Sequence, residues 1–158
     1  MKTRKIFLFL CLSVILIGCN QKASFDRDLL EGKWYNETKE TENGESVTTK
    51  MLLTFHSDEV ELNCKMIYEG LQFGRVKVSG TYSISGSSIK FDFDTKNLIV
   101  EVDRDFFDSQ LEYKAAIAEF KEEFEKEGFG SEEVVSISDE ELVLKDADGE
   151  ETTFLRKS

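Results

Sequence analysis

Alternation of apolar and polar residues is the feature that most constrains the fold of this chain. Its clearest run places an apolar side chain at every second position, at Val60, Leu62, Cys64, Met66 and Tyr68. Successive side chains of a β-strand point to opposite faces of the sheet, so this period predicts a strand with one buried face. The chain is therefore expected to be mainly β.

Similar runs recur along the sequence at intervals of about ten residues, separated by turn residues. Asn43-Gly44 and Ser85-Gly86-Ser87 are two of these turns, and Asn-Gly is a strong hairpin signal. Predicted strands cover residues 32–38, 47–56, 60–68, 76–84, 89–93, 98–102, 134–137, 142–144 and 152–155. Short links between regular short strands favour an up-and-down antiparallel β-barrel of about eight or nine strands.

Residues 105–127 interrupt the alternation and predict one long inserted α-helix. Large side chains recur there at intervals of three and four residues, at Phe106, Gln110, Tyr113, Ile117, Phe120 and Phe124. This spacing places them on one helical face, and Gly128 stands where a helix-ending glycine belongs. At roughly 34 Å the helix is longer than a small barrel is wide, so we expect it along the outside or over one end. Three roles fit it: cover for a seam, lid over a ligand mouth, or dimer face.

The first 18 residues have the pattern of a secretory signal. Lys2, Arg4 and Lys5 precede an apolar stretch at residues 6–17. The stretch is shorter than the roughly 20 apolar residues that a spanning helix needs. A signal peptide is therefore favoured, with a permanent N-terminal membrane anchor as the alternative.

The end of this stretch, Leu16-Ile17-Gly18-Cys19, resembles the bacterial lipobox. The resemblance implies cleavage before Cys19, an S-diacylglycerol on its sulfur and an acyl chain on its new amino group. Two or three chains anchor a protein firmly to a bilayer, whereas one binds only marginally. Asn20, next to the lipidated residue, implies sorting to the outer membrane. We expect a lipoprotein of the bacterial cell envelope, with a tether at 19–24 and a barrel domain at 25–158.

Charge narrows the range of partners. The formal net charge is −12, and loss of residues 1–18 would remove three cations and no anion, which gives −15. Phosphate contacts need clustered Lys and Arg, so a nucleic-acid partner is not expected. Docking on anionic lipid through a basic patch is disfavoured for the same reason.

Cysteine usage leaves a single thiol in the mature domain. Cys11 leaves with the signal and Cys19 carries lipid, so Cys64 has no intramolecular partner for a disulfide. Cys64 lies on the apolar face of its predicted strand. A buried small side chain is the favoured interpretation, with a reactive or pairing thiol as the alternative.

Two motifs resemble those of lipocalins and of bacterial lipocalin-like lipoproteins. The first strand opens with Gly32-Lys33-Trp34, and a later hairpin begins Gly80-Thr81-Tyr82. The resemblance implies a barrel over about residues 25–156, with Trp34 plugging its closed end and Arg156 packing over Trp34 through a cation–π contact. The helix departs from the family pattern, because it precedes the last three predicted strands. An open, sandwich-like form is therefore the alternative to a closed barrel.

No sequence motif indicates catalysis, and no cofactor or metal is expected. His56 is the only histidine, and no nucleophile-elbow motif accompanies it, so a solvated His56 is favoured over a catalytic one. Asp146-Ala147-Asp148-Gly149 resembles the start of a calcium loop, but Lys157 stands where the loop needs a Glu. A carboxylate pair is not excluded by composition, since acidic residues are abundant.

The sequence leaves two non-enzymatic functions open. A barrel of about eight strands can hold one small ligand in its interior. The first hypothesis is thus a lipid-anchored module that binds a small apolar or amphipathic molecule, with a lining of Leu53, Phe55, Leu62, Cys64, Met66, Val78, Tyr82, Phe91 and Phe93. The second is an envelope interaction or inhibitor module with a solid core, which would act through its surface.

Overall fold

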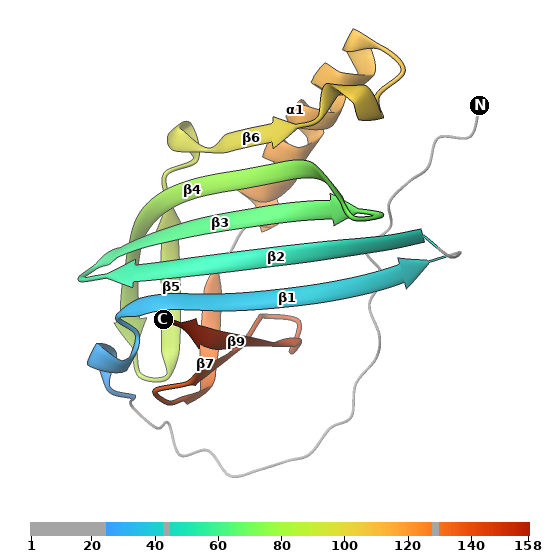
Figure 1. The fold of residues 1–158 in the computed structure, drawn as a ribbon. Helices are drawn as coiled ribbons and strands as arrows, with labels where there is room; N and C mark the ends of the chain where they lie inside the picture. Colours follow the sequence, from blue (N-terminus) through green and yellow to red (C-terminus); the bar gives the residue numbers. More distant parts are fainter. Residues whose placement is uncertain (1–24, 43–44, 128–129) are drawn as a thin grey trace.

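The computed structural model of the chain describes residues 25–42, 45–127 and 130–158. The predicted signal and tether, the predicted lipidation site Cys19, the Asn43-Gly44 turn and the predicted helix stop at Gly128 lie outside these residues. Figure 1 shows a β-barrel with a helix on one side. None of the helices that the structure describes combines the length and apolar character needed to cross a bilayer.

Nine antiparallel strands form one sheet, in the order β3-β2-β1-β9-β8-β7-β5-β4-β6, and a further β3–β4 pairing closes it. Eight strands make the barrel, and β6 is an extra strand on the edge of β4. Among the eight barrel strands, neighbours follow chain order apart from the β1–β9 pair and the step from β5 to β7, as in an up-and-down barrel. The strands are β1 (Gly32–Glu42), β2 (Glu45–His56), β3 (Glu59–Tyr68), β4 (Leu71–Ser85), β5 (Ser88–Phe93), β6 (Ile99–Val102), β7 (Ser131–Ile137), β8 (Glu141–Lys145) and β9 (Glu151–Lys157).

Closure is limited to one half of the barrel, because the long wall, made of β1–β4 with β6, extends beyond the short wall, made of β5 and β7–β9. β1 pairs with β9 only through residues 33–35, and β5 pairs with β7 only through residues 88–90. Beyond those pairs β1, β2, β3, β4 and β6 continue as one sheet, and β5 runs on beside β4 to Phe93. We call the part of the barrel that contains Trp34 the closed half. We call the concave face of β1, β2, β3, β4 and β6 beyond it the open half.

The closed half holds the hydrophobic core. Sixteen buried residues form a single cluster that includes Trp34, Leu53, Phe55, Ile89 and Phe154. Within the described residues no polar or charged residue is fully buried. Alternation therefore works as the sequence predicts, with apolar side chains inside.

Charged side chains occupy the outer face and pair between neighbouring strands. Lys50 lies 3.1 Å from Glu37, and Lys77 lies 3.2 Å from Glu61. Exposed pairs of this kind contribute about 0–1 kcal/mol each. These ion pairs therefore show which face points outward and contribute little to the stability of the fold.

Gly80 is required where β4 turns to run beside β5. A Cβ at this position would stand 2.2 Å from the Asp92 carbonyl oxygen, which is backbone and cannot move aside. Any side chain would push β5 away from β4 at the Gly80–Phe93 pair, next to the pair of core residues Tyr82 and Phe91.

The helix begins later than the apolar spacing predicts. α1 covers Gln110–Glu127, and residues Arg104–Phe106 form a separate 3-10 turn, η3. The Asp103 carboxylate accepts the Asp105 N–H and starts that turn, whereas Ser109 Oγ accepts the Glu112 N–H and starts the helix. The predicted start at residue 105 was wrong because these two caps divide the segment.

α1 lies beside β6 along the open half (Figure 1). Its inward face is half-buried: Phe120 and Phe124 pack against the core cluster, and the Phe124 ring is 6.3 Å from the Phe93 ring. Phe106, outside the helix, instead contacts Tyr68 and Phe73, with ring centroids 6.2 and 5.7 Å away. The described side chains of α1 include none that is fully buried.

Candidate functional site

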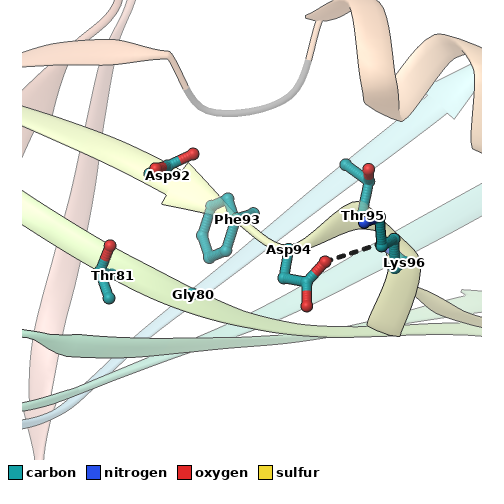
Figure 2. Close-up of a pocket in the computed structure, with 7 residues that line it drawn as sticks. All are labelled: Gly80, Thr81, Asp92, Phe93, Asp94, Thr95 and Lys96. Atoms are coloured by element: carbon teal, nitrogen blue, oxygen red, sulfur yellow. Dashed lines mark hydrogen bonds between the residues drawn. The ribbon is translucent and has the colours of Figure 1, made fainter.

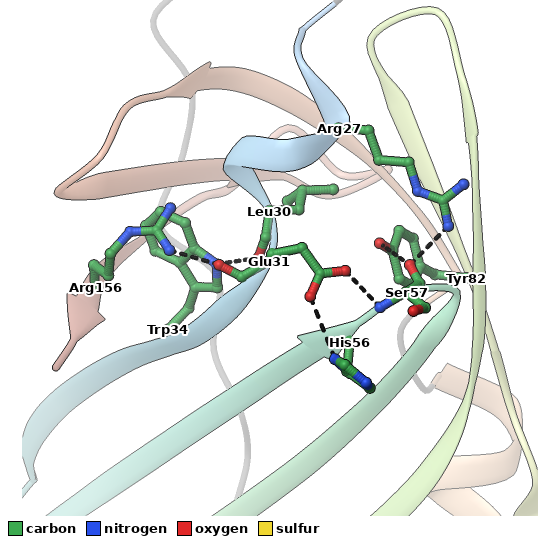
Figure 3. A network of polar contacts seen from close by, with 8 residues as sticks. All are labelled: Arg27, Leu30, Glu31, Trp34, His56, Ser57, Tyr82 and Arg156. Atoms are coloured by element: carbon green, nitrogen blue, oxygen red, sulfur yellow. Dashed lines mark hydrogen bonds and ion pairs between the residues drawn. The ribbon is translucent and has the colours of Figure 1, made fainter.

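The closed end of the barrel is sealed around Trp34. The indole is fully buried and donates its Nε1–H to the Leu30 carbonyl at 2.8 Å. The Arg156 guanidinium lies 4.2 Å from the ring centroid, in cation–π contact. Figure 3 shows the two side chains stacked beneath the turn that leads into β1.

Arg156 also ties three chain segments together through its five donors. Nη1 donates to the Glu31 carbonyl at 2.6 Å, Nη2 to the Leu29 carbonyl at 2.5 Å, and Nε to the Asp139 carbonyl at 2.6 Å. Gly32 makes room for this fork, since a Cβ there would stand 3.0 Å from Nη1, and its φ is +117°. The end of the barrel is thus closed by fixed contacts and offers no entry.

The polar cluster beside this seal is structural. The Tyr82 hydroxyl and Arg27 Nη2 both donate to the Ser57 carbonyl at 2.7 Å. Glu31 accepts the Ser57 N–H at 2.5 Å and lies 3.5 Å from Nδ1 of the exposed His56 (Figure 3). Ser57 takes part through its backbone only, so the cluster fixes the β2–β3 turn and places no activated nucleophile beside His56.

The nine residues predicted to line a ligand cavity fall into two groups. Leu53, Phe55, Leu62, Val78, Tyr82 and Phe91 are at most 5% exposed and belong to the core cluster. They fill the closed half, so they leave no ligand space there. The other three, Cys64, Met66 and Phe93, are half-buried and lie where the closed half gives way to the open half.

The inner face of the open half is apolar and partly exposed, and we call this face the trough. Met51 and Cys64 are directly paired on the inner face, and Met66 follows two positions along the same strand. Val100 of β6 and the α1 side chains Phe120 and Phe124 also pack against the core while staying partly exposed. The trough is defined as the inner face around Met51, Cys64, Met66, Phe93, Val100, Phe120 and Phe124.

Cys64 is an unreactive part of this wall. It is a free cysteine, and burial raises the pKa of its thiol to about 11. The thiolate is the reactive form, so the thiol stays protonated and inert near neutral pH.

Two polar residues of the interior escaped sequence reasoning. Asn36 stands on β1 where β9 departs, and its Nδ2 donates to the Thr153 carbonyl at 2.8 Å. Its Oδ1 is buried and accepts no hydrogen bond from any described residue. Glu132 of β7 pairs with the fully buried Ile89, which places it on the inner face. Extending the alternation two residues back from Val134 would have placed Glu132 on the inner face.

Burial raises the pKa of Glu132, and the nearby Asp146 carboxylate raises it further. Both effects disfavour the charged form. The inner face therefore carries a carboxyl group that gains from a hydrogen-bond donor or a cation.

Two depressions on the molecule open widely to solvent. One, of about 400 Å³, is lined by Gly80, Thr81, Asp92, Phe93, Asp94, Thr95 and Lys96 (Figure 2). The Asp94 carboxylate there accepts the Lys96 N–H at 3.1 Å, as part of a turn. The other, of about 450 Å³, lies outside the seal near Leu155 and Arg156. Neither is enclosed, and the described residues contain no group of three His, Cys, Asp or Glu arranged to hold a metal ion.

No family model matches the chain, and no curated protein matches it. Two solved structures resemble it. One is a lipocalin-like protein from Bacteroides uniformis, with 17% identity, a TM-score of 0.47, and coverage of 82% of this chain and 99% of that one. The other is an uncharacterized protein from Bacteroides eggerthii, with 15% identity, a TM-score of 0.46, and coverage of 81% and 99%. The fold assignment rests on the strand pairing itself.

Proposed function

We propose that the protein is a non-enzymatic binding module of the bacterial envelope that holds one small apolar or amphipathic molecule in the trough. The observation that carries the proposal is the half-buried inner face above a filled core. Met51, Cys64 and Met66 lie on the inner face yet stay partly exposed, in the stretch of β2 and β3 beyond the part of β1 that pairs with β9. Inward apolar surface that the protein leaves uncovered is the usual lining of a ligand site.

The chemistry of the lining favours a flexible, chain-like ligand over a rigid one. Methionine adapts its shape and contacts aromatic rings well, and the residues that define the trough include two methionines and three phenylalanines of β5 and α1. Each methylene that leaves water contributes about 0.8 kcal/mol. A chain of several carbons laid along the trough would therefore bind measurably without a shape-specific pocket.

Membrane attachment is part of the same proposal. Lipid on Cys19 would tether the domain through residues 19–24 to the closed end, where β1 begins. The acidic domain would be repelled by anionic headgroups, so the anchor rather than the surface would hold it at the outer membrane. Metabolic labelling with palmitate should mark the wild-type protein and leave Cys19→Ser unlabelled, whereas equal labelling would contradict the anchor.

Ligand binding is tested with the neutral fluorescent probe N-phenyl-1-naphthylamine. We expect saturable binding to the full chain, weakened several-fold by Met66→Ala, which removes part of the trough wall. Lys65→Ala is the matched control, because its side chain lies next in sequence on the outer face. Absence of saturable binding, or equal effects of the two variants, would sink the proposal.

An envelope interaction module is the second candidate, favoured by apolar surface at the open end. Leu71, at the start of β4, is 67% exposed. Phe106 is 42% exposed, and its ring contacts Tyr68, the strand partner of Leu71. Exposed apolar side chains grouped together suit a protein contact. Substitution Leu71→Ser with Phe106→Ser would abolish such a contact and leave probe binding in the trough intact.

A further inference from the structure

We infer that the ligand of the trough is an uncharged amphiphile whose head carries hydroxyl groups, and that this head lies on the β1 side of the trough. The inference rests on the proposed function, because it names the chemical class and the orientation of the molecule held at the same site. It follows from the strand register, which places polar side chains at one side of the inner face and apolar side chains at the other.

The strand register arranges the inner face of the long wall in rows. Trp34 lies on the inner face, so the even-numbered residues that follow it on β1 lie there too. The row next to the core joins Asn36, Met51, Cys64, Val76 and Val100. The following row joins Thr38, Thr49, Met66, Gly74 and Val102. Each row thus begins with a polar residue on β1 and ends with an apolar residue on β6.

The Thr38–Thr49 pair is the polar part of the second row. The two residues stand directly opposite each other on neighbouring strands, where Cβ atoms lie about 4.5–5.5 Å apart. Thr49 is half-buried and Thr38 is exposed. β1 continues here beyond its short pairing with β9 (Figure 1). A molecule in the trough can therefore approach both hydroxyl groups.

The side chain of Met66 lies on the other side of Thr49 and extends away from it. Met66 pairs with Thr49 on β2 and with Gly74 on β4. Its terminal methyl group lies over Gly74, where a Cβ would stand only 2.5 Å away from that methyl group. The thioether therefore adds apolar surface on the β4 side of the row and does not cover Thr49.

The chemistry of threonine matches a hydroxyl-bearing head. A threonine hydroxyl donates one hydrogen bond, accepts others and carries no charge. A hydroxyl group of a ligand has the same capacities, so it can exchange hydrogen bonds with Thr38 and Thr49. A few polar groups beside an apolar lining usually fix the orientation of a ligand. The head is therefore assigned to this pair, and the hydrocarbon chain to the side of Met66 and β6.

Charged heads would have other partners around the inner face. Glu40 is exposed two residues beyond Thr38 and would attract a cationic head. Lys96, just after β5, and Lys114 and Lys121 of α1 are also exposed and would attract an anionic head. Solvent and salt screen exposed charges of this kind. We therefore expect either charged head to bind less tightly than a hydroxyl-bearing one.

The test compares four amphiphiles with the same eight-carbon chain: glycerol monooctanoate, methyl octanoate, octanoate and octylamine. Affinity for the full chain is measured at pH 7, below the micelle-forming concentrations, by displacement of N-phenyl-1-naphthylamine. We expect the glycerol ester to bind at least threefold more tightly than the methyl ester, although the methyl ester is the more hydrophobic of the two. The glycerol ester should also bind more tightly than both charged amphiphiles.

Three variants separate the head from the chain. Thr49→Val removes the hydroxyl and keeps the shape of the side chain, so it should remove most of the preference for the glycerol ester. Thr48→Val is the matched control, because it makes the same change one residue away on the outer face and should keep the preference. Met66→Ala should weaken both esters by the same factor. Thermal unfolding of each variant confirms that it is folded.

The outcomes distinguish this inference from the proposed function. Equal binding of the two esters, or tighter binding of octanoate or octylamine, overturns the assigned head and leaves the binding function standing. Equal effects of Thr49→Val and Thr48→Val, or failure of all four amphiphiles to displace a saturably bound probe, do the same. Absence of saturable probe binding overturns the binding function itself, and the inference with it.

Discussion

Replacement of Arg156 by alanine should destabilise the protein more than any other single change at the surface of the barrel. The substitution removes the cation 4.2 Å above the buried Trp34 ring, a contact worth about 2 kcal/mol where water is excluded. It also removes three hydrogen bonds from a charged donor to the carbonyls of Leu29, Glu31 and Asp139, worth about 1.5–3 kcal/mol each. Ordering a long arginine side chain costs about 2 kcal/mol, and such terms are not additive. We expect a net loss of about 4 kcal/mol.

Urea denaturation of the full chain measures this loss directly. A loss of that size should lower the melting temperature by about 10 °C, since each kcal/mol shifts a domain of this size by about 2–4 °C. Arg156→Lys keeps the charge over the ring but loses the planar fork, so it should cost about half as much. Lys157→Ala, on the next residue and the opposite face, should cost less than about 0.5 kcal/mol.

The relative losses of stability in the three variants test this explanation of the seal. A loss below about 1 kcal/mol for Arg156→Ala would show that the seal is not held by this side chain. Equal losses for Arg156→Ala and Arg156→Lys would show that the carbonyl contacts matter and the cation–π contact does not. Only the graded series supports a seal built from both.

Three further predictions concern the interior. Tyr82→Phe removes the hydroxyl that donates to the Ser57 carbonyl and should cost about 1 kcal/mol in urea unfolding; no change would mean that water replaces it. Gly80→Ala places a Cβ 2.2 Å from the Asp92 carbonyl oxygen and should cost about 2–3 kcal/mol through strain, with β4–β5 amide exchange as the local readout. Glu132→Gln should stabilise the protein at neutral pH, because the pKa of this carboxyl is raised in the folded state. The wild-type protein then loses stability as pH rises from the unfolded pKa to the folded pKa, and the variant should lack that part of the pH dependence.

The nine strands were readable from the sequence because their inner faces are apolar over most of their length. The alternation that ends at Tyr68 and resumes at Val76 follows directly from burial against the core. The start of the helix was misread for an equally physical reason. Phe106 fits the helical spacing, but the caps at Asp103 and Ser109 give the backbone another way to satisfy its first N–H groups. When capping residues occur inside a stretch with helical apolar spacing, the caps rather than the spacing therefore decide where the helix begins.

An open form was an alternative from the sequence, but the place where the barrel opens was not readable, and β1 explains why. Its second half, residues 36–42, is polar on both faces, so alternation ended the predicted strand at residue 38, whereas β1 continues to Glu42. Those same residues have no strand on the side away from β2, because β9 pairs only with residues 33–35. Polar and charged side chains on an unpaired edge discourage pairing with other chains, and an inner face that borders water has no need of apolar residues. Residues 36–42, whose lack of alternation made the end of β1 unreadable, thus also form the open edge of the trough. Loss of alternation inside a long strand can itself indicate where a barrel opens.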